Sequence, residues 1–314
     1  MDFLSTFIIV LFVVVLAVPG FVLRKAKLFS DGASKVLASL LLYVTQPFLM
    51  VYSLLKYEFE KSMLVNFLWV ILFAVVLQLV IFFISKLLFL KSKDVAGKRV
   101  CEAASFMGNV GFMGIPVMQQ FFPENAELIV YTVAYNIVFN AMSWTLGIYT
   151  VTGEKKNIKP WKVIVNPPTI ASILVLPLFF LNVSLPSQIL TTCSYLGEMT
   201  LPLSMIILGV RLADIKLKKL FCNLKVYIVA FLKLVVSPLA SLGILLLVNL
   251  AVPLDSNVIL MLFVVAAMPT ASSVLNFAER YGGDQDTAAA STLMTTLLCV
   301  ITVPLLMLLC NLVI

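Results

Sequence analysis

Apolar runs of about 20 residues follow one another along almost the whole 314-residue chain. A helix needs about 20 such residues to cross roughly 30 Å of hydrocarbon, so these runs are typical of membrane-spanning helices. Hydrophobic residues make up 62% of the sequence and charged residues 12%, against about 45–50% and about 25% in soluble domains. The first run, residues 3–23, follows Asp2 and precedes a basic stretch from Arg24, the reverse of the charge order of a signal peptide. The chain is therefore predicted to be an all-α membrane protein that keeps its first helix.

Ten spans are expected, with only short connections between them: 3–23, 33–55, 64–90, 99–121, 126–150, 162–181, 188–212, 225–250, 256–279 and 285–312. Cytoplasmic loops of membrane proteins carry an excess of Lys and Arg. Here the odd-numbered loops hold nearly all of these residues, whereas the even-numbered loops hold only Lys56 and Lys61. The pattern predicts a multi-pass protein of the plasma membrane with both termini outside the cytoplasm. It also accounts for the net charge of +7 without a nucleic-acid partner.

Residues that usually carry enzymatic chemistry are missing or scattered. The sequence contains no histidine, the commonest general base and metal ligand. Its five cysteines have no paired spacing, which argues against a disulfide framework or a metal cluster. No nucleophile elbow is present either. We therefore expect neither enzymatic activity nor a metal or cofactor.

The chain also has an internal repeat. Pro19 and Pro47 lie in the first two expected spans, and Pro177 and Pro202 take equivalent places in the sixth and seventh. Spans four and nine, five apart, are both interrupted by glycine, proline or small polar residues, a pattern typical of secondary transporters with inverted repeats. Because five is odd, the second half enters the membrane from the opposite side. The predicted units are a first five-helix repeat at 1–150, a cytoplasmic linker at 151–162 and a second five-helix repeat at 163–314.

The two interruptions are the stretches "GNVGFMGIPVM" at 108–118 and "AAMPTASSVLNFAERYGGD" at 266–284. A helix broken inside the bilayer frees backbone N–H and C=O groups, which is tolerated only where protein or a watery cavity satisfies them. The half-helix ends then offer partial positive charge for a carboxylate and carbonyls for a cation. If the two broken helices cross, they form a ligand site, with these candidate residues: Gly108, Asn109, Gly111, Gly114, Pro116, Pro269, Ser272, Ser273 and Asn276. The alternative is that these are packing or kink residues; the matched pair of breaks favours the site.

Four further polar residues within the spans are candidates. Gln46, just before Pro47, is expected to face the cavity as a donor, and Asn140 either lines the cavity or bonds between helices. Lys233 and Glu198 are charges within the hydrocarbon, which are functional candidates by default. They form either a scaffold ion pair or a coupling element.

The motifs resemble those of the auxin efflux carrier family, which includes the plant PIN-type auxin exporters and many bacterial carriers. "GNVGFMGIPVM" is similar to the family's fourth helix, "NPPTIASILVL" at 166–176 to its sixth and "MPTASSVLNFAERYGGD" to its ninth. The resemblance implies a scaffold domain and a transport domain, with helices 4 and 9 crossing at the substrate site. It places Asn109 and Pro116 at the crossing, with Asn109 as the partner of a substrate carboxylate. It is also compatible with a homodimer, which no motif specifies.

Two departures from the plant exporters point to a short bacterial member of the family. Val274 takes the place of their crossing proline in helix 9, and the long loop between helices 5 and 6 is absent. Short members are associated with small organic anions such as malate or malonate. The resulting prediction is a carrier that moves dicarboxylates or monocarboxylates by alternating access at the helix 4/helix 9 crossing. The alternatives are a sodium- or proton-coupled symporter of the same fold, with Glu198 or helix 9 carbonyls as coupling element, and an anion channel.

Overall fold

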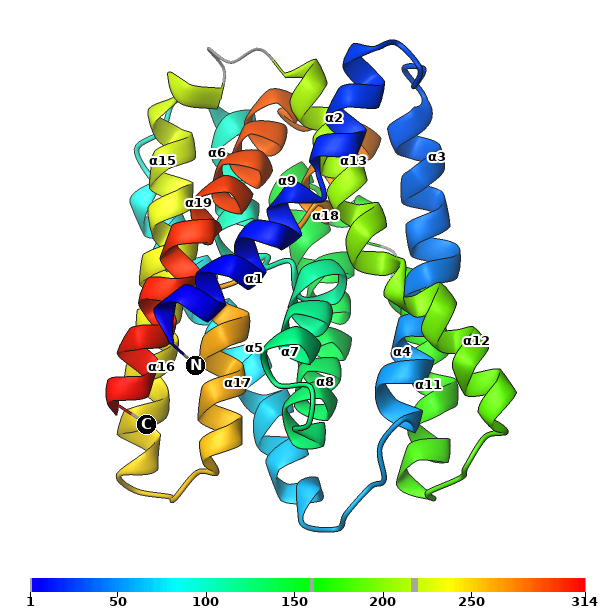
Figure 1. The fold of residues 1–314 in the computed structure, drawn as a ribbon. Coiled ribbons are helices and arrows are strands. Elements are labelled where there is room, and N and C mark those ends of the chain that lie inside the picture. Colours follow the sequence, from blue (N-terminus) through cyan, green and yellow to red (C-terminus); the bar gives the residue numbers. More distant parts are fainter. Residues whose placement is uncertain (1, 159–160, 216–219, 314) are drawn as a thin grey trace.

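The computed structural model describes residues 2–158, 161–215 and 220–313, and every regular element in these ranges is helical (Figure 1). The α-helices in the first half are α1 (Phe3–Val15), α2 (Val18–Lys25), α3 (Ala33–Leu40), α4 (Gln46–Leu55), α5 (Met63–Leu88), α6 (Val95–Phe106), α7 (Ile115–Phe121), α8 (Ala126–Met142) and α9 (Ile148–Thr152). Those in the second half are α10 (Trp161–Val165), α11 (Pro167–Phe180), α12 (Ser187–Glu198), α13 (Thr200–Asp214), α15 (Leu224–Phe231), α16 (Ser237–Asn249), α17 (Ser256–Ala266), α18 (Ser273–Tyr281) and α19 (Gln285–Val313).

Within the described ranges, six helical stretches are long and apolar enough to cross a membrane: Phe3–Lys25, Ala33–Leu55, Met63–Leu88, Ser187–Asp214, Leu224–Asn249 and Gln285–Val313. All six coincide with expected spans, and the described part adds two shorter apolar helices, α11 and α17. The remaining expected spans, 99–121, 126–150, 162–181 and 256–279, are divided into shorter helices. An all-α, multi-pass fold is therefore confirmed, whereas the count of ten spans stays a prediction.

Prolines shape several of these helices. Three of the four π-helical segments in the described ranges end two residues before a proline: Leu41–Thr45 before Pro47, Val110–Gly114 before Pro116 and Leu232–Val236 before Pro238. Proline lacks an N–H group, and its ring crowds the carbonyl of the residue four positions earlier. In these three helices that carbonyl lies within the π-helical segment, whose turn is wider. The helix can therefore continue through the proline with a local distortion.

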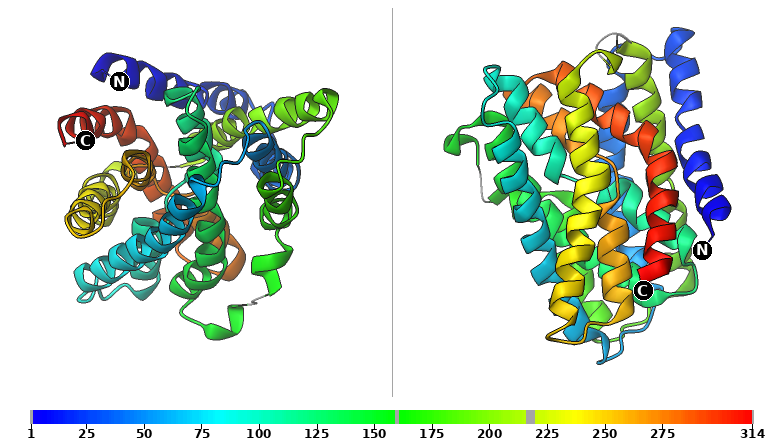
Figure 2. Two further views of the ribbon diagram at one scale, coloured as in Figure 1. Left: turned by 90° about the horizontal axis from the view of Figure 1, so that it is seen from below. Right: turned by 90° about the vertical axis from the view of Figure 1, so that its left-hand side faces the viewer.

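The helices form two groups. By their contacts, the first contains α2, α3, α4, α11, α12 and α13, and the second contains α5, α6, α8 and α15 to α19. The N-terminal helix α1 packs beside the C-terminal α19, as both views in Figure 2 show. Within the first group, α2 lies very close to α13, because a Cβ on Gly20 would meet the Ile206 carbonyl and one on Gly209 the Ala17 carbonyl. Such close approach through small residues is common between membrane helices. The second helix group holds both interrupted segments.

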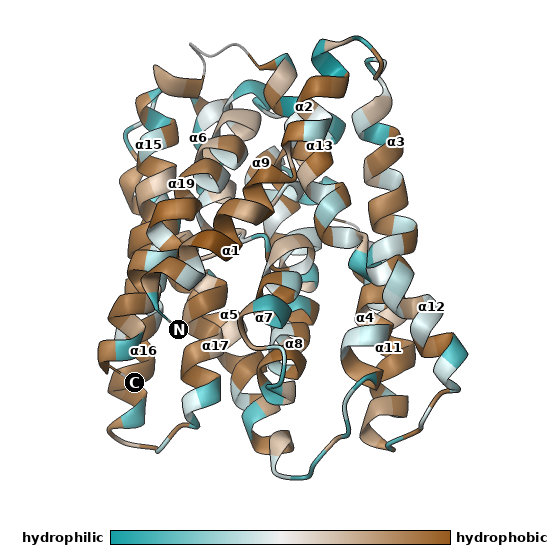
Figure 3. Cartoon of the chain, viewed as in Figure 1, coloured by the Kyte–Doolittle hydropathy of each residue, from teal (hydrophilic) through white to brown (hydrophobic). Residues whose placement is uncertain are grey.

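The outer surface is apolar between the two ends of the molecule. Figure 3 shows mostly hydrophobic residues along α1, α16 and α17, and hydrophilic ones at many helix ends and connecting loops. Large apolar side chains are widely exposed, for example Phe12 at 67%, Leu174 at 65% and Leu247 at 69%. Continuous exposed apolar surface of this kind fits a lipid environment.

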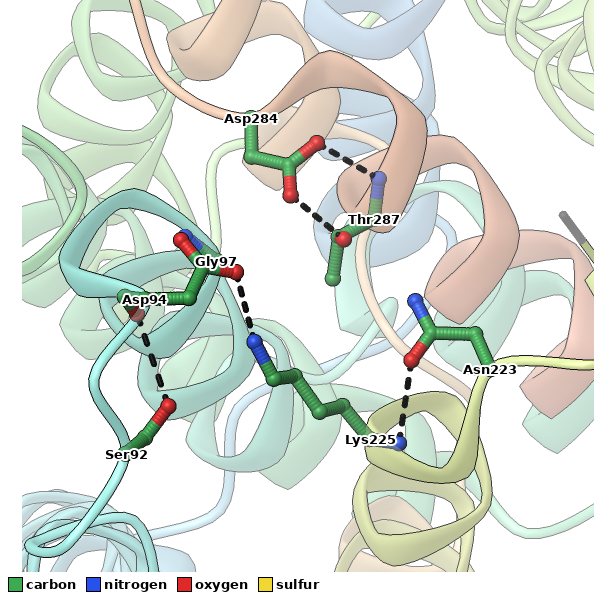
Figure 4. Close-up of polar contacts among 7 residues, drawn as sticks. All are labelled: Ser92, Asp94, Gly97, Asn223, Lys225, Asp284 and Thr287. Atoms are coloured by element: carbon green, nitrogen blue, oxygen red, sulfur yellow. Dashed lines mark hydrogen bonds and ion pairs between the residues drawn. The ribbon is translucent and has the colours of Figure 1, made fainter.

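The first turns of α6, α15 and α19 meet at one end of the molecule (Figure 4). Asp94 caps α6 by accepting the Gly97 N–H at 3.0 Å, and it also accepts from Lys225 Nζ of α15 at 2.5 Å. Asp284 caps α19 by accepting from the backbone N–H and Oγ1 of Thr287. A Cβ on Gly97 would lie 3.2 Å from Asp284 Oδ2, so α6 and α19 begin side by side.

Replacing Asp94 with alanine is expected to lower the free energy of unfolding by about 1 kcal/mol, chiefly through loss of the cap. The ion pair adds little because the Asp94 side chain is 48% exposed. The hydrogen bond from Lys225 holds the pKa of Asp94 below its usual value, so its stabilisation is present above about pH 4 and is lost as the pH falls further. The melting temperatures of the wild-type and Asp94→Ala proteins should therefore differ at pH 7, and the difference should shrink as the pH falls below about 4. Lys225→Ala keeps the cap, so its melting temperature should differ less from that of the wild type at pH 7. A difference between Asp94→Ala and wild type that did not shrink at low pH would contradict this account.

Candidate functional site

The two interrupted segments cross and satisfy each other's backbone. α6 ends at Phe106 and α17 at Ala266, and the extended residues that follow run antiparallel, with Gly108 opposite Thr270. The Asn109 N–H donates to the Pro269 carbonyl at 2.7 Å, and the Ala271 N–H donates to the Met107 carbonyl at 2.9 Å. The freed groups of both breaks are thus paired with each other, as a break inside a membrane requires.

Side chains reinforce the crossing. Thr270 donates its hydroxyl to the Ala104 carbonyl at the end of α6, and its N–H donates to Thr295 Oγ1 of α19 at 3.1 Å. Lys233 reaches the crossing from the π-helical segment of the α15–α16 span, where it is 3% exposed and donates from Nζ to the Ala266 carbonyl at 3.2 Å. The crossing is therefore held by both backbone and side chains.

A cavity of about 440 Å³ extends from the crossing to Lys35 near the start of α3 and Arg280 near the end of α18. Both helix groups line it. Its polar and charged lining residues are Lys35, Ser39, Gln46, Asn109, Asn140, Ser143, Ser204, Arg211, Ser272, Ser273, Asn276, Glu279 and Arg280. Aromatic walls come from Tyr43, Phe112, Phe139, Trp144 and Phe277, of which Trp144 and Phe277 pack edge to face at 5.4 Å between ring centroids. A mostly apolar wall with a few convergent polar groups is typical of a small-molecule site.

Arg211 is the most enclosed cation of the cavity, because its side chain is only 11% exposed. From the end of α13 it reaches across to α18, where Nη2 donates to Asn276 Oδ1 at 2.9 Å and Nη1 to Glu279 Oε1 at 3.2 Å. Its Nε has no hydrogen-bond partner among the described residues. The guanidinium therefore joins the two helix groups and retains a free donor.

Other lining side chains also have unused hydrogen-bonding capacity. Within the described ranges, Asn140 Nδ2, Ser143 Oγ and Ser273 Oγ are buried without a partner. Gln46 is 3% exposed, and its Nε2 lies where a Cβ on Gly111 would be. Glycine at position 111 therefore lets the amide of the first helix group reach the crossing segment. Buried polar groups without partners are uncommon in proteins, and these cluster around one cavity.

The structure brings most of the predicted site residues together. Those that line the cavity are Gln46, Asn109, Gly111, Asn140, Ser272, Ser273 and Asn276. Gly108 and Pro269 belong to the crossing backbone. Gly114 and Pro116 do not line the cavity: they end the π segment and begin α7, where both are buried in helix packing. Asn136, one turn from Asn140, is fully buried and donates to Met50 Sδ, so it bonds between helices.

Glu198 and Lys233 do not form an ion pair, which was one of the two alternatives predicted for them. Glu198 is exposed on α12 in the first helix group and accepts from Ser194 Oγ at 2.6 Å, whereas Lys233 is buried in the second group. Periodicity could place both residues within spans, but it could not say which helices are neighbours.

Three cations of the cavity were not predicted as site residues. Lys35, Arg211 and Arg280 fall near predicted span ends, and in the sequence their charge is explained by topology alone. For Arg211 a signal existed, because it lies inside the expected span 188–212, and a charge inside a span is a functional candidate.

Comparisons with known proteins agree with these observations. The family model described as "membrane transport protein" matches residues 5–307. The chain is 28% identical over 298 residues to the uncharacterized transporter MJ1031 of Methanocaldococcus jannaschii, covering 92% of this chain and 93% of that protein. It is 27% identical over 218 residues to the uncharacterized transporter YfdV of Escherichia coli K12, covering 66% of each protein.

Proposed function

This chain belongs to the membrane transport protein family, that of the auxin efflux carriers, and we propose that it is a carrier of small organic anions. The observation that carries the anion assignment is the charge of the cavity. Among the described residues that line it, three are cations, Lys35, Arg211 and Arg280, and one is an acid, Glu279. A cleft lined by one sign of charge concentrates ions of the opposite sign.

The deep end of the cavity supports the same assignment. Asn109, Gln46 and Asn140 supply side-chain amides there, and Ser272 and Ser273 stand at the first turn of α18. A helix N-terminus carries partial positive charge and free N–H groups, which favour a carboxylate. In this proposal Asn109 and the start of α18 bind one carboxylate, and Arg211 binds a second carboxylate or a hydroxyl group nearer the opening. Small dicarboxylates and hydroxy acids are the preferred class.

The proposed mechanism is alternating access around the crossing. It rests on ten spans arranged as two inverted five-helix halves, 1–150 and 163–314, joined at 151–162. The second helix group would move with Asn109 and Asn276 against the first group with Gln46 and Arg211. The exposed lining residues Lys35 and Arg280 mark the opening of the cavity, and Arg24 pairs with Asp31 and Asp214 at the same end of the molecule. The excess of Lys and Arg in cytoplasmic loops assigns this end to the cytoplasm, so we infer an inward-open conformation.

Transport by purified protein in proteoliposomes tests the proposal. Liposomes are loaded with malate, malonate, lactate, succinate or indole-3-acetate, and uptake of the same radiolabelled acid is measured with an equal pH on both sides. We expect saturable uptake of at least one acid and counterflow driven by the internal acid. Uptake that is linear with concentration and shows no counterflow would favour a channel. Absence of uptake for every acid, with folded protein in the bilayer, would reject the anion assignment.

A further inference from the structure

The ammonium of Lys233 lies at the point where both broken helices end. Its Nζ donates to the Ala266 carbonyl, the last residue of α17. On the other side, a Cβ on Gly108 would lie 3.0 Å from Nζ and 3.3 Å from Cε, and Gly108 follows α6 by two residues. Lys233 therefore contacts both crossing segments at once, and the absence of a side chain at position 108 leaves room for it.

Both helices that stop here present their carbonyl ends. The last carbonyls of a helix lack partners within it and carry partial negative charge. At the end of α6, the Ala104 carbonyl is bonded by Thr270 and the Met107 carbonyl by the Ala271 N–H. At the end of α17, Lys233 bonds the Ala266 carbonyl with a cationic donor. A positive charge is the natural complement of two such ends.

No acid in the described ranges forms an ion pair with Lys233. The other buried residue of acidic or basic type in these ranges, Glu102, lies in the second half of α6 and pairs with Lys98 instead. The described part also contains no group of three acidic or sulfur ligands that could hold a metal ion. A buried ammonium without a counter-ion is unfavourable unless nearby dipoles or an anion compensate it. The helix ends supply the dipoles, and the cavity begins at Asn109, the next residue after Gly108.

We propose that Lys233 is a resident cation of the crossing, which takes the place that a coupling sodium ion would otherwise fill between the carbonyl ends of α6 and α17. In carriers with broken helices such carbonyl ends commonly coordinate the coupled cation. Here a tethered ammonium bonds the Ala266 carbonyl of α17 and lies against Gly108 after α6. It stays there in every cycle, because Lys233 belongs to the same helix group as the crossing. The inference rests on the proposed anion transport. Lys233 is a positioning residue: it holds the crossing together and favours an anion beside it without contacting that anion.

The test is counterflow in proteoliposomes with sodium fully replaced by choline. The substrate is whichever of malate, malonate, lactate, succinate and indole-3-acetate the wild-type protein exchanges fastest. Wild-type exchange should be unchanged without sodium. Lys233→Ala should lower exchange by about tenfold or more, since a charge-assisted hydrogen bond is lost. Ethylammonium, which can enter the space left by the side chain and donate N–H groups, should restore much of the exchange, whereas tetramethylammonium, which cannot donate, should not.

Lys225→Ala is the matched control, because it removes a lysine on the same span that pairs with Asp94 at the surface. Its exchange should be near wild type and insensitive to ethylammonium. The proposal is overturned if wild-type exchange requires sodium, if Lys233→Ala exchanges normally, or if its loss is not reversed by ethylammonium. Failure of the wild-type protein to exchange any acid would instead reject the proposed function, and the inference with it.

A second pair of variants applies if Lys233→Ala does not fold. Gly108→Ala keeps the lysine but places a methyl group against its ammonium, whereas a Cβ on Gly114 would have ordinary contacts of 3.4 Å or more. Both glycines are buried in the same interrupted segment. We expect Gly108→Ala to lower exchange by about tenfold, by weakening the same charged hydrogen bond, and Gly114→Ala to leave it near wild type. Equal exchange by the two variants would overturn the proposal.

Discussion

Replacing Arg211 with alanine is expected to raise KM for the transported anion by about 10- to 100-fold, the range for losing a hydrogen bond to a charged group. Arg211 is the most enclosed cation of the cavity, and its Nε has no partner among the described residues. The measurement is the concentration dependence of uptake into proteoliposomes. Arg280→Ala is the matched control, because Arg280 is an exposed arginine at the opening of the same cavity, and its KM should change only a few-fold.

A substitution of Glu279 distinguishes a role of Arg211 in binding the anion from a purely structural role. Glu279 pairs with Arg211 at 3.2 Å and competes with an incoming carboxylate for the guanidinium. Glu279→Gln should therefore lower KM, the opposite of the effect of Arg211→Ala. If Arg211 serves only to tie α13 to α18 through Glu279, the two substitutions should impair transport alike. That outcome would remove Arg211 from the site.

Replacing Asn109 with alanine is expected to reduce kcat/KM by about 10- to 100-fold while leaving the amount of folded protein in the membrane unchanged. The crossing uses the Asn109 backbone: its N–H donates to the Pro269 carbonyl, and its own carbonyl accepts from the Met113 and Gly114 N–H groups. None of the side-chain hydrogen bonds in the described part involves its amide, which lines the cavity. Alanine therefore preserves the crossing and removes only a ligand-facing group. Transport rates are compared at equal protein in proteoliposomes.

Asn109→Asp sharpens this test because the aspartate side chain is nearly the same size but negatively charged. For an anion, the aspartate should impair transport more than the alanine does, because like charges repel in an enclosed site. If Asn109→Asp transported as well as wild type, or better, the ligand at this position would be neutral or cationic. Gly114→Ala, in the same interrupted segment but away from the cavity, serves as the control for disturbance of the segment.

Much of the fold follows from local sequence. Runs of apolar residues predict the six long spans correctly, because hydrocarbon thickness fixes the length of a spanning helix. The interruptions in 108–118 and 266–284 also predict that freed backbone groups must find partners, and the Asn109–Pro269 and Ala271–Met107 hydrogen bonds are those partners. That each interrupted segment is the partner of the other followed from their matched positions five spans apart, not from composition.

The rest depends on which helices are neighbours, and a single sequence does not encode that locally. An arginine near the end of a span looks the same in the sequence whether its side chain lies in a loop or lines a cavity. The excess of Lys and Arg in cytoplasmic loops therefore already explained Arg211 and Arg280. Lys233 and Glu198 are both charges within spans, yet only the three-dimensional arrangement shows one at the crossing and the other on the outer surface. Gly114 and Pro116 share the motif of Asn109, but helical rotation turns them into the packing around α7.

Binding of an anion in the cavity is the central claim, and Trp144 in the cavity wall reports on it directly. The sequence has three tryptophans, so replacing Trp69 and Trp161 with phenylalanine leaves Trp144 as the single tryptophan, which can be excited selectively over the tyrosines. Titration of this protein in detergent with malate, malonate, lactate and succinate, which do not fluoresce, should give a saturable change in emission for at least one acid. The same titration should fail, or shift to about 10- to 100-fold higher concentration, when Asn109→Ala is added. No saturable change with any acid, or an identical curve in the Asn109→Ala protein, would contradict the account.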